Sequence, residues 1–231
     1  MRALAIDTSH AAGSVAAAAA DRVATRSLGV AGEHAAVLAA RLTEVAEELG
    51  WRLADAELIA VVRGPGSFTG LRVGVATAKA IAWAAETRLL GLSAFELVAE
   101  ATARLTGWTD GPLQIGFDAG RGEVFAARVV TDRTRPTGWR LEPAALLPAA
   151  AWIEALPQGS RVSGPAAAQH AAAITAAGHA LAPEAGWFPS ATAALAVARL
   201  RAAAGEADDP QSLVPEYLRP SYADERRPAG P

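Results

Sequence analysis

Short apolar runs separated by polar breaks open the chain. ALAID is followed by the polar turn TSHAAGS, the apolar run VAAAAA, the pair DR and the alternating stretch VATRSL. Runs of this length, bounded by turn residues, are typical of strands joined by hairpins. We therefore expect three antiparallel strands at the start of the chain.

A helical period follows from His34 to Leu49. Its apolar positions recur at spacings of four, three and four: Leu38, Leu42, Val45 and Leu49. This spacing places them on one stripe of a helix, and Gly50 suits the position just after a helix end.

Strands and helices then alternate. The pattern predicts a buried strand in ELIAVVRG, a loop at GPGS, a helix to about Ala85 and a short strand in RLLGL. The next helix, SAFELVAEATARL, begins with Ser93 and has Glu96 three residues later, which is a capping-box pattern. A further helix is expected from an N-cap at Ser190 to about Ala204, closed by Gly205.

A second hairpin, in LQIGFD, AGRGE and VFAARVV, repeats the opening of the chain. Each opening has an apolar strand that ends in an aspartate, Asp7 or Asp118, and then a glycine-containing turn. The repetition predicts two duplicated domains, residues 1–108 and 109–222, joined near WTDGP. Residues 223–231 are expected to be a disordered tail.

Composition and charge narrow the class of protein. The 231 residues are 52% apolar, carry a net charge of −3 and include no cysteine, and the pI of about 5.8 argues against a nucleic-acid binder. The first residues do not suggest a signal peptide, and no apolar stretch approaches a membrane span of about 20 residues. We therefore expect a cytoplasmic protein without membrane contact.

The loop in RGPGSFTGLRVGVATAKAIA outlines a phosphate cradle but fits neither common motif. The position that a P-loop or a dinucleotide fingerprint reserves for its later glycine, counted from Gly64, falls on Thr69. The helix after it carries a ridge with little side chain, formed by Gly70, Gly74, Ala78 and Ala82. The ridge packs either within this chain or against another subunit.

Residues that could still hold a nucleotide or phosphate at a seam between subunits, or be the relic of such a site, gather around two turns. They are Asp7, Thr8, Gly64, Gly66, Ser67 and Thr69. With Asp7 positioning magnesium and Asp118 in the second half, they allow one alternative function, an autonomous ATPase or phosphotransferase. No histidine or carboxylate spacing indicates a metal site, and no GxSxG motif supports a hydrolase.

Several motifs together resemble the TsaB (YeaZ) family. They are AIDTSHAAGSVA, EHAAVLAARL, RGPGSFTGLRVGVATAKA, DAGRGEV and PEYLRP, in that order along nearly the whole chain. The resemblance implies an α/β fold of the ASKHA type, the actin and sugar-kinase fold related to ribonuclease H, with two duplicated domains.

The resemblance also implies a function. Such a chain is a non-catalytic dimerisation subunit that binds and activates TsaD, which threonylcarbamoylates N6 of the adenosine beside the anticodon of tRNA. TsaE joins the complex, tRNA contact is mainly through the partners, and a homodimer is possible when the chain is alone. The HxxxH metal pair of TsaD has no counterpart in Leu92–Val98, and the adenosine region, SGPAAAQ, is degenerate. We therefore expect no cofactor bound by this chain itself, and ATP or ADP with Mg²⁺ in the partners.

By the same resemblance, the helices from His34 and from Thr69 form one face that meets TsaD in a four-helix seam. The predicted interface residues are His34, Leu38, Arg41, Leu42, Val45, Leu71, Arg72, Val75 and Lys79. The competing interpretation is that the apolar members of this set face the domain's own sheet.

Overall fold

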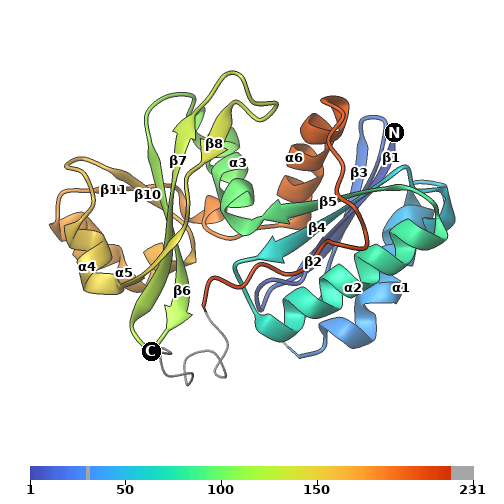
Figure 1. Cartoon of the computed structure of the whole chain (residues 1–231), viewed down its shortest axis with the longest axis horizontal. Coiled ribbons are helices and arrows are strands. Elements are labelled where there is room, and N and C mark those ends of the chain that lie inside the picture. The colour runs from blue at the N-terminus through green and yellow to red at the C-terminus, as the bar shows by residue number, and fades with distance from the viewer. Residues whose placement is uncertain (30–31, 220–231) are drawn as a thin grey trace, which may run out of the picture.

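A computed structural model describes residues 1–29 and 32–219, so the predicted tail, residues 223–231, lies outside the described residues. Two sheets stand side by side, with helices between them and on their outer faces (Figure 1). This agrees with the predicted α/β class.

The first sheet has the strand order β3-β2-β1-β4-β5. The first three strands form an antiparallel meander, and β4 and β5 continue the sheet in parallel with β1. The strands are β1 (Arg2–Asp7), β2 (Ser14–Ala19), β3 (Arg22–Ser27), β4 (Leu58–Gly64) and β5 (Arg88–Ser93). The predicted opening meander is therefore confirmed.

Two helices, α1 (His34–Glu48) and α2 (Phe68–Ala84), cover the outer face of this sheet (Figure 1). The stripe predicted on α1 packs against the sheet, because Leu38 and Leu42 share a buried cluster with Leu4 and Ile6 of β1. A short 3₁₀ turn (Leu53–Asp55) precedes β4.

The other face of the first sheet is covered by α3 (Ala94–Thr106) and α6 (Ala191–Ala203), which lie between the two sheets (Figure 1). One buried cluster joins the sheets through these helices, with Phe95 of α3 meeting Phe117 at a ring-centroid distance of 5.0 Å. Ser93 caps α3 in the predicted capping box, and Ser190 caps α6.

The second sheet has the order β11-β10-β6-β7-β8, with β9 paired to β7. Its strands are β6 (Leu113–Gly120), β7 (Glu123–Thr131), β8 (Trp139–Leu141), β9 (Ala145–Pro148), β10 (Arg161–Ser163) and β11 (Ala180–Leu181). Helices α4 (Ala149–Glu154) and α5 (Pro165–Ala176) and a 3₁₀ turn (Glu184–Gly186) complete this half. Read from β8, the order β8-β7-β6-β10-β11 matches β3-β2-β1-β4-β5 of the first sheet, with β6 in the place of β1. A duplicated domain is expected to show this match.

The two sheets divide near the predicted junction, but the end of the chain returns to the first half. Helix α6 packs on β1 and β2. Residues 206–219, which we call the C-terminal strap, then run beside β5 and β4: Asp208 N donates to Leu89 O at 2.8 Å and Glu216 N donates to Arg63 O at 2.7 Å. Residues 191–219, which belong to the predicted segment 109–222, thus pack against the first sheet.

Candidate functional site

The end of β1 and the first residues of the turn after it, a predicted phosphate or magnesium site, are buried. Asp7 and Thr8 are 0% exposed and Ser9 is 2% exposed. The Oδ1 atom of Asp7 accepts hydrogen bonds from the Ser9 amide at 2.9 Å and from the Ser9 hydroxyl at 2.6 Å. The carboxylate therefore organises its own turn.

Helix α2 covers the first residues of this turn, Thr8 and Ser9. A Cβ atom at Gly70 would overlap the carbonyl oxygen of Thr8, and one at Gly74 would overlap the Thr8 hydroxyl. That hydroxyl donates to Gly70 O at 2.7 Å, and the Ser67 amide donates to Ser9 O at 2.7 Å. The glycine ridge thus packs within this chain, the first of the two alternatives considered.

His10 joins the turn to the segment before α6. Its Nε2 atom lies 3.0 Å from Pro189 O and 3.2 Å from Asp7 Oδ2, so Asp7 forms an ion pair with the protonated ring beside the bond to the carbonyl. Burial opposes the charge on the ring, but the Asp7 carboxylate and the Pro189 carbonyl outweigh it and raise the pKa of His10 above its usual value. The pair thereby ties the first hairpin to the second half.

A cavity of about 110 Å³ opens beside this turn, at the N-terminal ends of α1 and α2. Thr8, His10, His34, Ser67 and Thr69 are among the residues that line it. Its volume is enough for several water molecules or for a group of phosphate size.

The other predicted phosphate residues do not line this cavity. Asp7 lies beneath the turn, and Gly64 is covered by the strap, since a Cβ atom there would lie 2.6 Å from Glu216 O. Gly66 faces the backbone of Ser9.

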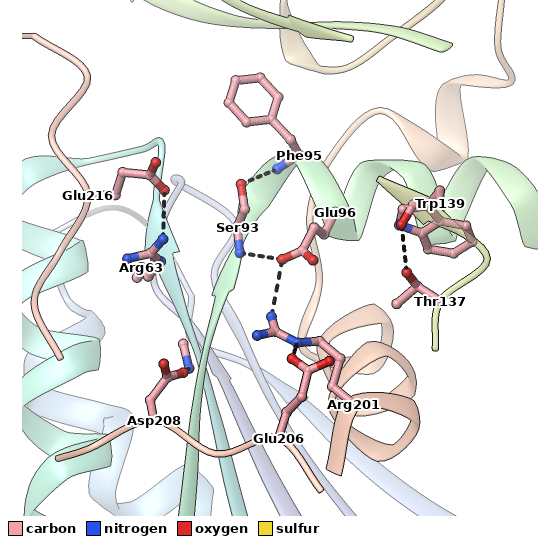
Figure 2. Close-up of polar contacts among 11 residues, drawn as sticks. Arg63, Ser93, Phe95, Glu96, Thr137, Trp139, Arg201, Glu206, Asp208 and Glu216 are labelled. Atoms are coloured by element: carbon pink, nitrogen blue, oxygen red, sulfur yellow. Dashed lines mark hydrogen bonds and ion pairs between the residues drawn. The ribbon is translucent and has the colours of Figure 1, made fainter. Parts of the chain in front are cut away.

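A larger cleft of about 340 Å³ lies between β5, the β7–β8 hairpin and the C-terminal strap (Figure 2). It lies at the start of α3, in the stretch Leu92–Val98, where the sequence has no counterpart of the TsaD metal pair. Here Glu96 Oε2 accepts from Ser93 N at 3.0 Å and lies 3.5 Å from Arg201 Nη1. Glu96 is therefore a helix cap and an ion-pair partner.

The strap completes this network. Arg201 Nε donates to Glu206 Oε2 at 2.7 Å, and Asp208 Oδ2 accepts from Gly91 N at 2.8 Å. These acceptors come from the end of the chain, and no local sequence motif pointed to them. Within residues 1–29 and 32–219, no three histidine, aspartate or glutamate side chains are placed to hold a metal ion.

Most of the predicted interface residues are core residues in this structure. The exposed fraction is 7% or less for all six of His34, Leu38, Leu42, Val45, Leu71 and Val75. The apolar members are buried because a helix that lies on a sheet turns its apolar stripe toward that sheet, and His34 lies against the first hairpin, with Nε2 3.2 Å from Ala11 O. A partner that docks on the folded chain would therefore touch other residues of these helices.

The three charged residues of the set are more exposed, and each has a partner within the chain. Arg41 Nη1 donates to Glu44 at 2.8 Å, Arg72 Nε donates to the Tyr217 hydroxyl at 2.8 Å, and Lys79 Nζ donates to Leu213 O at 3.1 Å. Two of the three thus hold the C-terminal strap.

The outward surface of α1 and α2, which we call the α1–α2 face, is rich in alanine. Its exposed alanines are Ala35, Ala36, Ala39 and Ala40 on α1 and Ala76, Ala80 and Ala84 on α2. Large aromatic residues stand near the two ends of α2: Phe68 is 53% exposed and Trp83 is 83% exposed. Aromatic residues are enriched in protein interfaces, so these two side chains are candidates for contact with another protein.

No helix in the described part of the chain is both long and apolar enough to cross a membrane.

Comparison with known proteins places the chain in a family. The family model TsaD, tRNA N6-adenosine threonylcarbamoyltransferase, matches residues 28–146, just over half of the chain. The chain is also 34% identical over 132 residues to the tRNA threonylcarbamoyladenosine biosynthesis protein TsaB of Escherichia coli, covering 57% of this chain and 56% of that protein. It is 38% identical over 71 residues to the TsaB protein of Bacillus subtilis, covering 31% of this chain and 29% of that one.

A solved structure extends the match to nearly the full chain. A Pseudomonas aeruginosa protein described as similar to peptidase YEAZ superposes with a TM-score of 0.80 at 25% identity, covering 94% of this chain and 99% of that chain. The sequence matches are shorter and span about half or less of the length of the curated relatives. In sequence and in fold, this chain belongs to the TsaB (YeaZ) family, within the group that the TsaD family model matches.

Proposed function

We propose that this chain is a non-catalytic subunit of the machinery that makes threonylcarbamoyladenosine in tRNA, and that it acts by binding a TsaD-type subunit through the α1–α2 face. The observation that carries the proposal is this exposed face, with its alanines and its two exposed aromatic residues. Tryptophan is among the residues that contribute most to binding energy in protein interfaces.

The family model supports a partner with a related surface. The matched residues, 28–146, include both helices of the face, so a TsaD-type subunit carries a related pair. Two alanine-rich helix pairs can approach closely and pack their ridges into each other's grooves. The same geometry allows a homodimer when the chain is alone.

The environment of Asp7 favours a non-catalytic role for this chain. Its carboxylate is 0% exposed and engaged with Ser9 and His10, an environment that leaves it no room to bind ATP or hydrated magnesium. In this proposal TsaD transfers the threonylcarbamoyl group to N6 of the adenosine, and this chain stabilises the active state of TsaD. TsaE joins the same complex. The partner subunits make most of the contact with tRNA and bind the ATP or ADP with Mg²⁺, and the complex works in the cytoplasm.

One observation bears on the alternative of nucleotide binding. The 110 Å³ cavity lies at the N-terminal ends of both helices of the face, so a phosphate group there would be enclosed further by a docked partner. An ATPase activity of the purified chain that Asp7→Ala abolishes would favour autonomous catalysis instead.

The test is binding and reconstitution. Calorimetry should detect binding of the cognate TsaD-type subunit, and tRNA threonylcarbamoylation by purified TsaD and TsaE, with the adenylate-forming enzyme, should require this chain. Ala76→Glu places a charge on the α1–α2 face and should weaken binding roughly 100-fold or more, because a buried unpaired charge is costly.

Ala172→Glu is the matched control, because Ala172 is an exposed alanine on α5. Equal binding by both variants would exclude this face as the docking site. Full modification activity without the chain would exclude the subunit role.

A further inference from the structure

Two motifs that lie far apart in the sequence meet at the surface. Phe68 and Arg72 come from GSFTGLR at the start of α2, and Tyr217 comes from PEYLRP in the strap. The Phe68 and Tyr217 rings lie 5.1 Å apart, and the Arg72 guanidinium carbon lies 3.8 Å from the centroid of the Phe68 ring. We call these three residues the aromatic–arginine stack.

The stack is exposed although it is built from large side chains. Phe68 is 53% and Tyr217 is 46% exposed, and Val214, earlier in the strap, is 59% exposed. Apolar surface gathered in one place on a folded chain marks a contact site more often than single exposed residues do.

The guanidinium group of Arg72 is held in place, and some of its hydrogen-bond donors remain available. Its Nε atom donates to the Tyr217 hydroxyl at 2.8 Å. Among the described residues, no hydrogen bond or ion pair from its two terminal nitrogens is found. An arginine fixed by stacking and by one hydrogen bond presents these nitrogens in the planar geometry that binds a carboxylate with two parallel bonds.

The strap holds Tyr217 in position. Lys79 Nζ donates to Leu213 O at 3.1 Å, Glu216 N donates to Arg63 O at 2.7 Å, and Arg219 Nη2 lies 2.6 Å from Glu123 Oε2. Anchors on both sides fix the tyrosine before any partner arrives, so little ordering entropy is lost on binding.

We infer that the aromatic–arginine stack is an anchor of the docking surface and that it receives an acidic side chain of the TsaD-type subunit. The inference rests on the proposed function and extends the surface from α1 and α2 to the C-terminal strap. A protein carboxylate fits better than an RNA phosphate backbone. One arginine is enough to bind a single carboxylate with two parallel bonds, whereas the chain has a net charge of −3 and a pI of about 5.8, without the excess of basic residues that a phosphate backbone needs.

The test is the dissociation constant for the cognate TsaD-type subunit, measured by calorimetry at low and high salt. Arg72→Gln should weaken binding roughly 10- to 100-fold, as expected for an arginine at the centre of an interface. Arg72→Lys should recover only part of this loss, because lysine keeps the charge but not the planar fork. Tyr217→Phe keeps the ring and should weaken binding less than Arg72→Gln.

Leu105→Ala is the matched control, since Leu105 is 50% exposed on α3. Thermal unfolding of each variant separates lost contacts from lost stability. Unchanged affinity of Arg72→Gln and Tyr217→Phe, with tight binding by the unaltered chain and weak binding by Ala76→Glu, would overturn this inference and leave the proposed function standing.

Two other results would also decide the matter. No binding by the unaltered chain would overturn the proposed function and this inference with it. If Arg72→Gln leaves the affinity for the subunit unchanged but lowers the affinity for a tRNA anticodon stem-loop, the stack binds RNA and this inference is overturned.

Discussion

At the scale of single residues, His10 links two distant parts of the chain through one ring. Its Nε2 atom reaches both the Asp7 carboxylate and the carbonyl of Pro189, 179 positions along the sequence. Burial lowers the pKa of His10, but the Asp7 carboxylate beside the ring and the Pro189 carbonyl outweigh burial and raise the pKa above the usual 6.5. The protonated ring therefore stabilises the folded chain.

This arrangement predicts how stability depends on pH. A group whose pKa is raised on folding contributes its full stabilisation below the unfolded pKa of about 6.5, and loses it as the pH rises through the folded pKa. The free energy of unfolding should therefore fall between about pH 6 and pH 8.5 in the unaltered chain, and fall less in His10→Gln. Urea unfolding at both values measures the difference. A variant with the same pH slope as the unaltered chain would contradict the role given to the Asp7 pair.

At the scale of elements, much of the structure follows from local signals. The hydroxyl caps at Ser93 and Ser190 and the helical period from His34 identified helix positions correctly. The same period could not say what the stripe on α1 faces, because burial against a sheet and burial against a partner need the same residues. The strap carries neither a helix cap nor a periodic apolar stripe, and some of its contacts are to main-chain groups of β4 and β5, which no local pattern in the strap identifies.

The glycines of α2 are an element-scale feature with a direct test. Glycine within a helix costs about 1 kcal/mol relative to alanine, so Gly74→Ala on an open helix would stabilise the protein. Here the new methyl group meets the Thr8 hydroxyl, and we expect a net loss of about 1 to 3 kcal/mol in the free energy of unfolding.

A double-mutant cycle with Thr8→Ala identifies the cause. Removing the Thr8 hydroxyl should cancel most of the cost of Gly74→Ala. The same background should not rescue Gly70→Ala, because the methyl group there meets the Thr8 carbonyl oxygen, which every residue carries. Denaturant unfolding of the five variants measures both couplings, and additive effects of Gly74→Ala and Thr8→Ala would show that the ridge is not in contact with this turn.

At the scale of the whole molecule, the duplication was readable from the sequence but its assembly was not. The repeated strand-end aspartates predicted two related halves, and the mirrored strand orders agree. The position of α6 depends on a surface that only the folded first half presents, the inner face of β1 and β2. No residue pattern within α6 distinguishes that surface from a site in the second half, because small and apolar residues suit both.

This return of α6 predicts that the first half is not stable alone. A fragment of residues 1–108 would expose Ala3, Ala5, Ala16 and Ala18, which are all 0% exposed in the full chain and share a buried cluster with α6. Exposing this inner face removes a large part of a core that is small to begin with. The fragment should therefore show no cooperative thermal unfolding. Joining residues 188–219 to it through a Gly/Ser linker should restore a cooperative transition, because α6 and the strap again cover the sheet. Cooperative unfolding of the fragment without this addition would mean that the two halves are independent units after all.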